Sequence, residues 1–131
     1  MCGIAGYVAA PGKVADPEIL KKMAAVMAVR GPDGEGVFTH GVLGLAHRRL
    51  SVIDLESGCQ PMTARGGDLV IVFNGEIFNF KELRAELEAK KYVFVTQSDT
   101  EVLLAMYETY GITSLSRLNG FFAFALYDGR E

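Results

Sequence analysis

A short apolar run directly after the second residue constrains this chain most, because it draws the N-terminus into the fold. Residues 4–9 are apolar or small, and the dipeptide Pro11-Gly12 follows them. A run of this length bounded by turn residues predicts a buried strand. The strand would begin beside Cys2, so the Cys2 thiol would be held rigidly at the end of a core strand, as a catalytic group requires.

Cys2 is itself a candidate nucleophile. Cysteine is small enough for the initiator Met1 to be removed, which would leave a thiol and a free α-amine on one residue. Their unperturbed pKa values are about 8.5 and about 7.7–8.0, so the amine could serve as the base for the thiol. The alternative is that Cys2 is only a small residue beside the start codon. If Met1 is retained, the amine lies on the wrong residue and Cys2 has no attached base.

The rest of the chain alternates helical and strand patterns within a length that suits one domain. Helix starts are expected at Asp16-Pro17, at Asn79 with Glu82 as a capping box, and at Ser98 with Glu101 as another. Strands are expected at residues 37–39 and 42–46, which form a hairpin around His40-Gly41, and at residues 69–73, 92–95 and 121–127.

The composition argues against several classes of function. The formal net charge is −3 and no basic patch stands out, which disfavours nucleic acid or an anionic membrane as a partner. No apolar run approaches the roughly 18 residues of a membrane span, and no secretory signal is visible. The two cysteines suit a reducing cytosol, and with the two histidines they lack the spacing of a zinc site, so no metal is expected. The turn at residues 30–34 lacks the ending of a phosphate-binding loop.

Two polar features could serve a site or only the fold. Asn74-Gly75 follows a hydrophobic strand, where it is either a turn or a pair of hydrogen-bond donors. Asp99 is expected at the first position of a helix, where the helix dipole favours a carboxylate.

Five motifs in one order carry a resemblance to a known family. They are Cys2-Gly3-Ile4, Arg30-Gly31-Pro32-Asp33, His47-Arg48-Arg49-Leu50-Ser51, Asn74-Gly75-Glu76 and Ser98-Asp99-Thr100-Glu101. On these motifs the chain is similar to the class II, N-terminal-nucleophile glutamine amidotransferases, and most similar to the N-terminal glutaminase domain of glutamine-hydrolysing asparagine synthetases.

The resemblance covers essentially all 131 residues. It implies an α+β fold of the Ntn-hydrolase type, a four-layer αββα sandwich with antiparallel sheets. It also implies that residues 1–131 form an incomplete glutaminase domain, because the family's domain continues further and is followed by a synthetase domain.

The resemblance assigns the catalytic roles to three residues. Cys2 would attack the side-chain amide carbon of L-glutamine and form a thioester, which water then cleaves to release glutamate. The side-chain amide of Asn74 and the backbone N–H of Gly75 would stabilise the tetrahedral oxyanion. These groups suit that role, since an amide and an unshielded backbone N–H are both hydrogen-bond donors.

The resemblance assigns substrate binding to a second set of residues. Arg49 would bind the α-carboxylate of glutamine, and Asp99 with Glu76 would bind the α-ammonium. Backbone groups around Val52 and Ile53 would line the same pocket. Arg48, the neighbour of Arg49 on the expected strand, should face the opposite way.

Four further residues are not assigned to the expected site. Arg30 and Asp33 could touch the site or could form an ion pair that braces a loop. We interpret His47 as structural and Cys59 as an incidental thiol.

The resemblance also bears on cofactors and partners. The glutaminase reaction is expected to need no cofactor, and ATP and Mg²⁺ are implied only for the synthetase domain that would receive the ammonia. The partners implied are L-glutamine, that C-terminal domain and a second copy in a homodimer, in the cytoplasm. Two other interpretations stay open: the glutaminase domain of an amidotransferase with an acceptor other than aspartate, and a non-catalytic glutaminase-like module if Met1 is retained.

Overall fold

The computed structural model describes residues 1–51, 58–64 and 66–130. The elements run in the order β1 (Gly3–Val8), α1 (Pro17–Val26), β2 (Gly34–His40), β3 (Leu43–Arg49), β4 (Met62–Thr63), β5 (Leu69–Ile77), α2 (Phe80–Ala89), α3 (Asp99–Tyr110), the 3₁₀ helix η1 (Gly111–Arg117) and β6 (Gly120–Asp128).

The strands form two antiparallel sheets, one in the order β1-β3-β2 and the other in the order β4-β5-β6. In the first sheet Gly3 lies opposite Arg48, so the start of β1 lies beside the end of β3. In the second sheet Asn74 lies opposite Ala123 near the end of β5. The register therefore brings Cys2 next to Arg49 by strand pairing alone.

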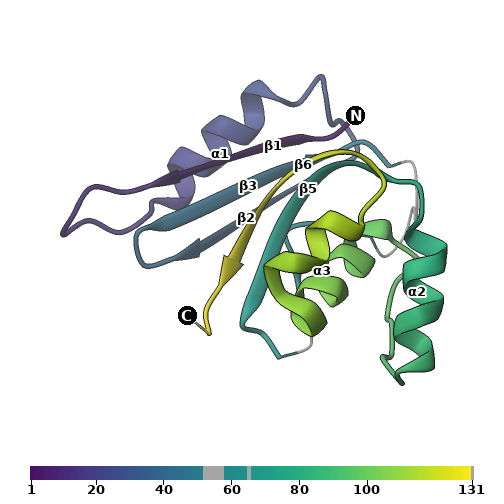
Figure 1. Ribbon diagram of the computed structural model, residues 1–131. Helices are drawn as coiled ribbons and strands as arrows, with labels where there is room; N and C mark the ends of the chain where they lie inside the picture. The colour runs from purple at the N-terminus through teal and green to yellow at the C-terminus, as the bar shows by residue number, and fades with distance from the viewer. Residues whose placement is uncertain (52–57, 65, 131) are drawn as a thin grey trace.

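The elements stack in four layers (Figure 1). Helix α1 covers the outer face of the β1-β3-β2 sheet, and α3 covers the outer face of the β4-β5-β6 sheet, with α2 packed beside α3. The inner faces of the two sheets meet, with β1 and β3 both contacting β5. This is the αββα arrangement expected from the sequence, and the prediction of an α+β fold with antiparallel sheets is confirmed.

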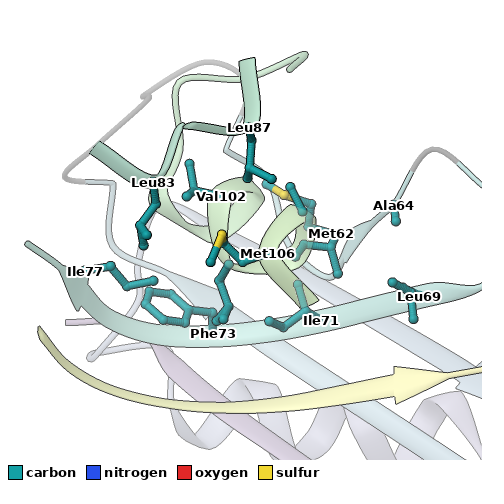
Figure 2. Packing of buried hydrophobic residues seen from close by; sticks show 13 residues of the cluster. Met62, Ala64, Leu69, Ile71, Phe73, Ile77, Leu83, Leu87, Val102 and Met106 are labelled. Atoms are coloured by element: carbon teal, nitrogen blue, oxygen red, sulfur yellow. The ribbon is translucent and has the colours of Figure 1, made fainter. Parts of the chain in front are cut away.

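Strand β5 is buried on both faces. Figure 2 shows Ile71 and Phe73 pointing from β5 toward the helices, where Val102 and Met106 of α3 meet them. The intervening Val72 instead lines a groove between the sheets with Leu45. A strand packed on both sides has little freedom to shift, so the residues at its end are held firmly. Residues 74–77 occupy that end.

All three helices begin where expected, but only two of them have the expected N-terminal side-chain cap. The Asp16 carboxylate accepts the Glu18 N–H at 2.8 Å, and the Ser98 hydroxyl accepts the Thr100 N–H at 3.0 Å. Asn79 precedes α2 but makes no capping bond, because its side chain binds Arg117 O and the N–H of Asn119. The predicted capping box at Asn79 is therefore wrong.

The expected strand at residues 92–95 is also wrong, since this segment forms no regular element. The carboxylate of Glu101 accepts the N–H groups of Val95 and Thr96 at 2.8 and 2.6 Å. These backbone donors are thus satisfied by a side chain and need no neighbouring strand. The same contacts keep Glu101 from completing the capping box predicted with Ser98.

Asn74-Gly75 is no turn, because β5 continues through both residues to Ile77. Gly75 lies opposite Phe122 with φ of +152°. A Cβ atom there would lie 2.2 Å from the Phe121 carbonyl oxygen. The β5 backbone passes so close to β6 beside the candidate donors that only glycine fits this position.

No helix in the described part of the chain is long and apolar enough to cross a membrane. Within residues 1–51, 58–64 and 66–130, no three His, Cys, Asp or Glu side chains are grouped so that they could hold a metal ion.

Candidate active site

A cavity of about 190 Å³ opens where the ends of β1, β3 and β5 meet the start of α3. It is smaller than the roughly 300–1,000 Å³ typical of pockets for drug-sized ligands, which suits a ligand of amino-acid size. Val52 and Ile53, expected to line the same site, lie outside the described residues. The six other residues expected in the site all line the cavity: Cys2, Arg49, Asn74, Gly75, Glu76 and Asp99.

The thiol of Cys2 is fixed at the wall of the cavity. Its Sγ lies 3.4 Å from the N–H of Leu50 and 3.5 Å from the Leu50 carbonyl oxygen. The next residue, Gly3, packs so closely on Met27 that a Cβ atom would lie 2.9 Å from the Met27 sulfur. Both thiols of the chain, Cys2 and Cys59, are free.

Arg30 holds the backbone of the candidate nucleophile. Its Nε donates to the Cys2 carbonyl oxygen at 2.7 Å. Asp33 accepts the N–H of Ser51 at 2.8 Å, and no ion pair joins Arg30 to Asp33 in the described structure. Of the two interpretations left open for these residues, the loop-bracing ion pair is therefore wrong.

The side-chain amide of Asn74 is not fully hydrogen-bonded within the described structure. Its Oδ1 atom is buried and has no hydrogen-bond partner among the described residues. Leaving a buried polar atom unpaired is costly, and such atoms in native proteins often mark a functional site. Asn74 and Gly75 lie side by side on β5 and line the same cavity as the Cys2 thiol.

Asp99 supplies a buried carboxylate on the opposite wall. It begins α3, is 5% exposed, and its Oδ2 accepts the N–H of Ile77 at 3.0 Å. Burial raises the pKa of Asp99 above its ordinary value, and the carboxylate of Glu76 raises it further. Two carboxylates that repel each other across a cavity favour a bound cation.

Arg49 brings a positive charge to the same cavity. It ends β3 and is 8% exposed, and its Nη1 lies 3.9 Å from the Cys59 sulfur. Its neighbour Arg48 faces away, as predicted, and pairs with Glu35 at 2.7 Å. The cavity thus has one arginine and two carboxylates, as recognition of a zwitterionic amino acid requires.

His47 lies between the two sheets rather than in the cavity. It is fully buried, and its Nε2 lies 3.1 Å from the Phe73 carbonyl oxygen. A carbonyl only accepts, so Nε2 carries the proton. Burial lowers the pKa of His47 from 6.5 to about 4, an effect that the Arg49 charge reinforces. The imidazole is therefore neutral near pH 7, and because it does not line the cavity it cannot reach Cys2 as a general base.

The depressed pKa of His47 predicts a loss of stability in mild acid. The unfolded chain takes up a proton as the pH falls below 6.5, whereas the folded protein does so only near pH 4. Between pH 7 and pH 5 this one group should lower the free energy of unfolding by about 2 kcal/mol. The raised pKa of Asp99 acts in the opposite direction, since it favours the folded state in acid.

Urea unfolding of the protein and of His47→Gln at both pH values isolates the His47 contribution. The variant should lose less stability between pH 7 and pH 5, by about 2 kcal/mol. Equal losses in the two proteins, or an imidazole signal of His47 that titrates near pH 6.5 in NMR spectra, would contradict the buried neutral histidine.

Comparisons with known proteins identify the family of this domain. Residues 1–131 match the family described as "Glutamine amidotransferase domain". The chain is 47% identical to asparagine synthetase [glutamine-hydrolyzing] 1 of Bacillus subtilis, with all of the chain and 21% of that protein covered. It is 43% identical to asparagine synthetase B [glutamine-hydrolyzing] of Escherichia coli, with 87% and 21% covered. The chain thus spans about a fifth of the length of these relatives.

A solved structure supports the fold independently of these sequences. Glutamine phosphoribosylpyrophosphate amidotransferase from Bacillus subtilis superposes with a TM-score of 0.73 at 24% identity, covering 98% of this chain and 35% of that one. At that identity the likeness bears on the fold alone, which is the sandwich described above. The family match covers the whole chain, so the chain belongs to the family of glutamine amidotransferase domains.

Proposed function

We infer that this protein hydrolyses the side-chain amide of L-glutamine through a thioester on Cys2 and supplies the ammonia to an ATP-dependent synthetase domain of the asparagine synthetase type. The observation that supports this most is the composition of one cavity. A fixed thiol, two oxyanion donors, an arginine and two carboxylates line it together. Each of these groups matches one part of glutamine.

Besides the groups of the chain itself, the proposed reaction needs only glutamine and water. Removal of Met1 frees the α-amine of Cys2, which accepts the thiol proton as Sγ attacks the amide carbon. The carbon–nitrogen bond then breaks, and the same proton leaves with the amide nitrogen as ammonia. Water attacks the thioester, the carbon–sulfur bond breaks, and glutamate and the free thiol result.

Both tetrahedral intermediates place a negative charge on the former carbonyl oxygen. The Asn74 amide and the Gly75 N–H are proposed to donate to that oxygen. Because they are held in place before the reaction by a strand packed on both faces, they need no reorganisation when the charge develops.

The proposed substrate orientation follows from the charges. Arg49 binds the α-carboxylate, while Asp99 and Glu76 bind the α-ammonium. The positive charge of the ammonium offsets the repulsion between the two carboxylates. Backbone groups around Val52 and Ile53 are proposed to complete this end of the pocket. With the α-carboxylate and the α-ammonium both held, only an amide at the end of a side chain as long as that of glutamine would reach the Cys2 sulfur.

The proposal extends to the surroundings of the domain. The hydrolysis uses no cofactor, and ATP and Mg²⁺ would serve the acceptor reaction in the synthetase domain. Aspartate is the proposed acceptor, because the named relatives are asparagine synthetases. A cytoplasmic location and a homodimer complete the proposal.

The test is a comparison of amides. The purified protein is incubated with L-glutamine, D-glutamine or L-asparagine, and glutamate, aspartate and ammonia are measured. The proposal predicts equimolar glutamate and ammonia from L-glutamine and little product from the other two, since the shorter or inverted substrate misplaces its amide carbon. No product from L-glutamine, or equal rates on L-asparagine, would contradict it.

Replacing Arg49 by lysine should weaken glutamine binding. Lysine keeps the charge but loses the two-pronged contact, and a hydrogen bond between charged groups contributes about 1.5–3 kcal/mol. We expect KM for glutamine to rise by about 10- to 100-fold with little change in kcat. Arg130→Lys, which alters an exposed pair with Asp128, is the matched control. A large fall in kcat at unchanged KM would show that Arg49 acts on the chemistry instead.

A further inference from the structure

The backbone of Phe73, directly before Asn74, is held by two side chains rather than by a strand. In an antiparallel strand the N–H and C=O of one residue point to the same side. Gln60 Oε1 accepts the Phe73 N–H at 2.6 Å, and His47 Nε2 donates to the Phe73 C=O at 3.1 Å. Both groups of Phe73 are therefore satisfied from one edge of β5.

Strand β4 explains why side chains are needed there. It pairs with β5 through Met62 opposite Ile71 and Thr63 opposite Val70, and the Ala64 N–H donates to the Leu69 carbonyl oxygen, but the strand does not extend from Met62 toward Phe73. Continuing that register would bring residue 60 opposite Phe73, and Gln60 does lie there. However, the bond comes from its side chain, while its carbonyl oxygen approaches Gly36 so closely that a Cβ atom there would lie 2.2 Å away. Gln60 thus replaces the missing strand partner with its amide group.

The same two side chains connect the walls of the cavity. Gln60 Nε2 donates to Thr100 Oγ1 at 3.3 Å, in the first turn of α3 beside Asp99. His47 lies on β3 two residues before Arg49, so the two share a face of that strand. Through Phe73, the two bonds link the elements that carry the carboxylate, the arginine and the oxyanion donors.

We propose that Gln60 and His47 are positioning residues that fix the Phe73 backbone and thereby aim the Asn74 amide and the Gly75 N–H at the oxyanion. This rests on the proposed function, in which Asn74 and Gly75 are the oxyanion donors. Such donors must lie about 2.7–3.1 Å from the oxyanion, and an error of about 1 Å from a change outside the chemistry can cost about 100-fold. The two bonds act on the residue next to those donors.

Gln60 is the better residue to test, because it is only half-buried whereas His47 is fully buried. Gln60→Met keeps the shape of the side chain and removes both hydrogen bonds. Gln60→Glu keeps an oxygen that can accept the Phe73 N–H, and the Thr100 hydroxyl can rotate to donate to it. Comparing the two variants separates the effect of losing the hydrogen-bond acceptor from the effect of altered packing.

The experiment measures kcat and KM for glutamine in each variant, and the fraction of Cys2 labelled at completion by the diazoketone analogue of L-glutamine. The proposal predicts that Gln60→Met lowers kcat by about 10- to 100-fold with KM within about threefold and with complete labelling. Gln60→Glu should recover most of the lost kcat. A merely structural residue would instead lower the labelled fraction and kcat together.

Several results would overturn this inference. They are a kcat in Gln60→Met within about threefold of the parent protein, incomplete labelling that accounts for the loss, or a Gln60→Glu variant as impaired as Gln60→Met. The inference and the proposed function fail differently. A parent protein that is neither labelled nor active refutes the glutaminase, whereas an active parent matched by Gln60→Met refutes only the positioning role.

Discussion

Replacing Cys2 by alanine is expected to abolish glutamine hydrolysis while leaving the fold intact. The thiol is proposed to form the covalent bond to the substrate, and Cys2 is the only cysteine among the described residues that line the cavity. Removing the nucleophile of a hydrolase costs several orders of magnitude, so we expect a loss of about 1,000-fold or more in kcat. The measurement is glutamate release at saturating L-glutamine.

Cys59→Ala is the matched control for this variant, because Cys59 is exposed and is the only other cysteine of the chain. It should keep kcat within about threefold of the parent protein. The thermal melting of Cys2→Ala should match that of the parent, since Cys2 is only half-buried. Residual hydrolysis within about tenfold of the parent would remove Cys2 from the nucleophile role.

Replacing Asn74 by alanine should give the second largest effect. The variant loses one of the two proposed oxyanion donors, and removing such a donor typically raises the barrier by about 2.7–4 kcal/mol. We expect kcat to fall by about 100- to 1,000-fold with KM nearly unchanged, because the donor acts on the charge that develops after binding. Steady-state kinetics with L-glutamine separates the two parameters.

Asn119→Ala provides the comparison for Asn74, since this exposed asparagine lies just before β6 and outside the cavity. It should leave both kinetic parameters within about twofold. If Asn74→Ala instead raised KM at constant kcat, the amide would be binding ground-state glutamine and the oxyanion assignment would be wrong.

Local signals in the sequence predicted the elements whose backbone groups are satisfied locally or by regular strand pairing. The Asp16 cap with proline at the next position fixes the start of α1, and the hairpin around His40-Gly41 forms as expected. The expected strand at residues 92–95 failed, because Glu101, further along the chain, takes its backbone donors. The Asn79 capping box failed for the same kind of reason, since residues 117 and 119 take its side chain.

The same distinction between local and distant contacts applies to the residues of the site. The motifs predicted residues that carry charge or reactivity, and the structure brings Cys2, Arg49 and Asp99 into one cavity with the end of β5. The backbone contacts of Arg30 with Cys2 and of Gln60 with Phe73 were not predicted, because they join segments distant in the sequence. An arginine or glutamine in a turn gives no sign of the backbone group that it will bind.

The most direct test of the central claim is an intact-mass spectrum of the purified protein before and after treatment with the diazoketone analogue of L-glutamine. The account predicts a protein that has lost Met1 and gains a single adduct on Cys2, with no adduct on Cys2→Ala. A protein that retains Met1 and gains no adduct, or one that is labelled equally well without Cys2, would contradict an N-terminal cysteine nucleophile in this cavity.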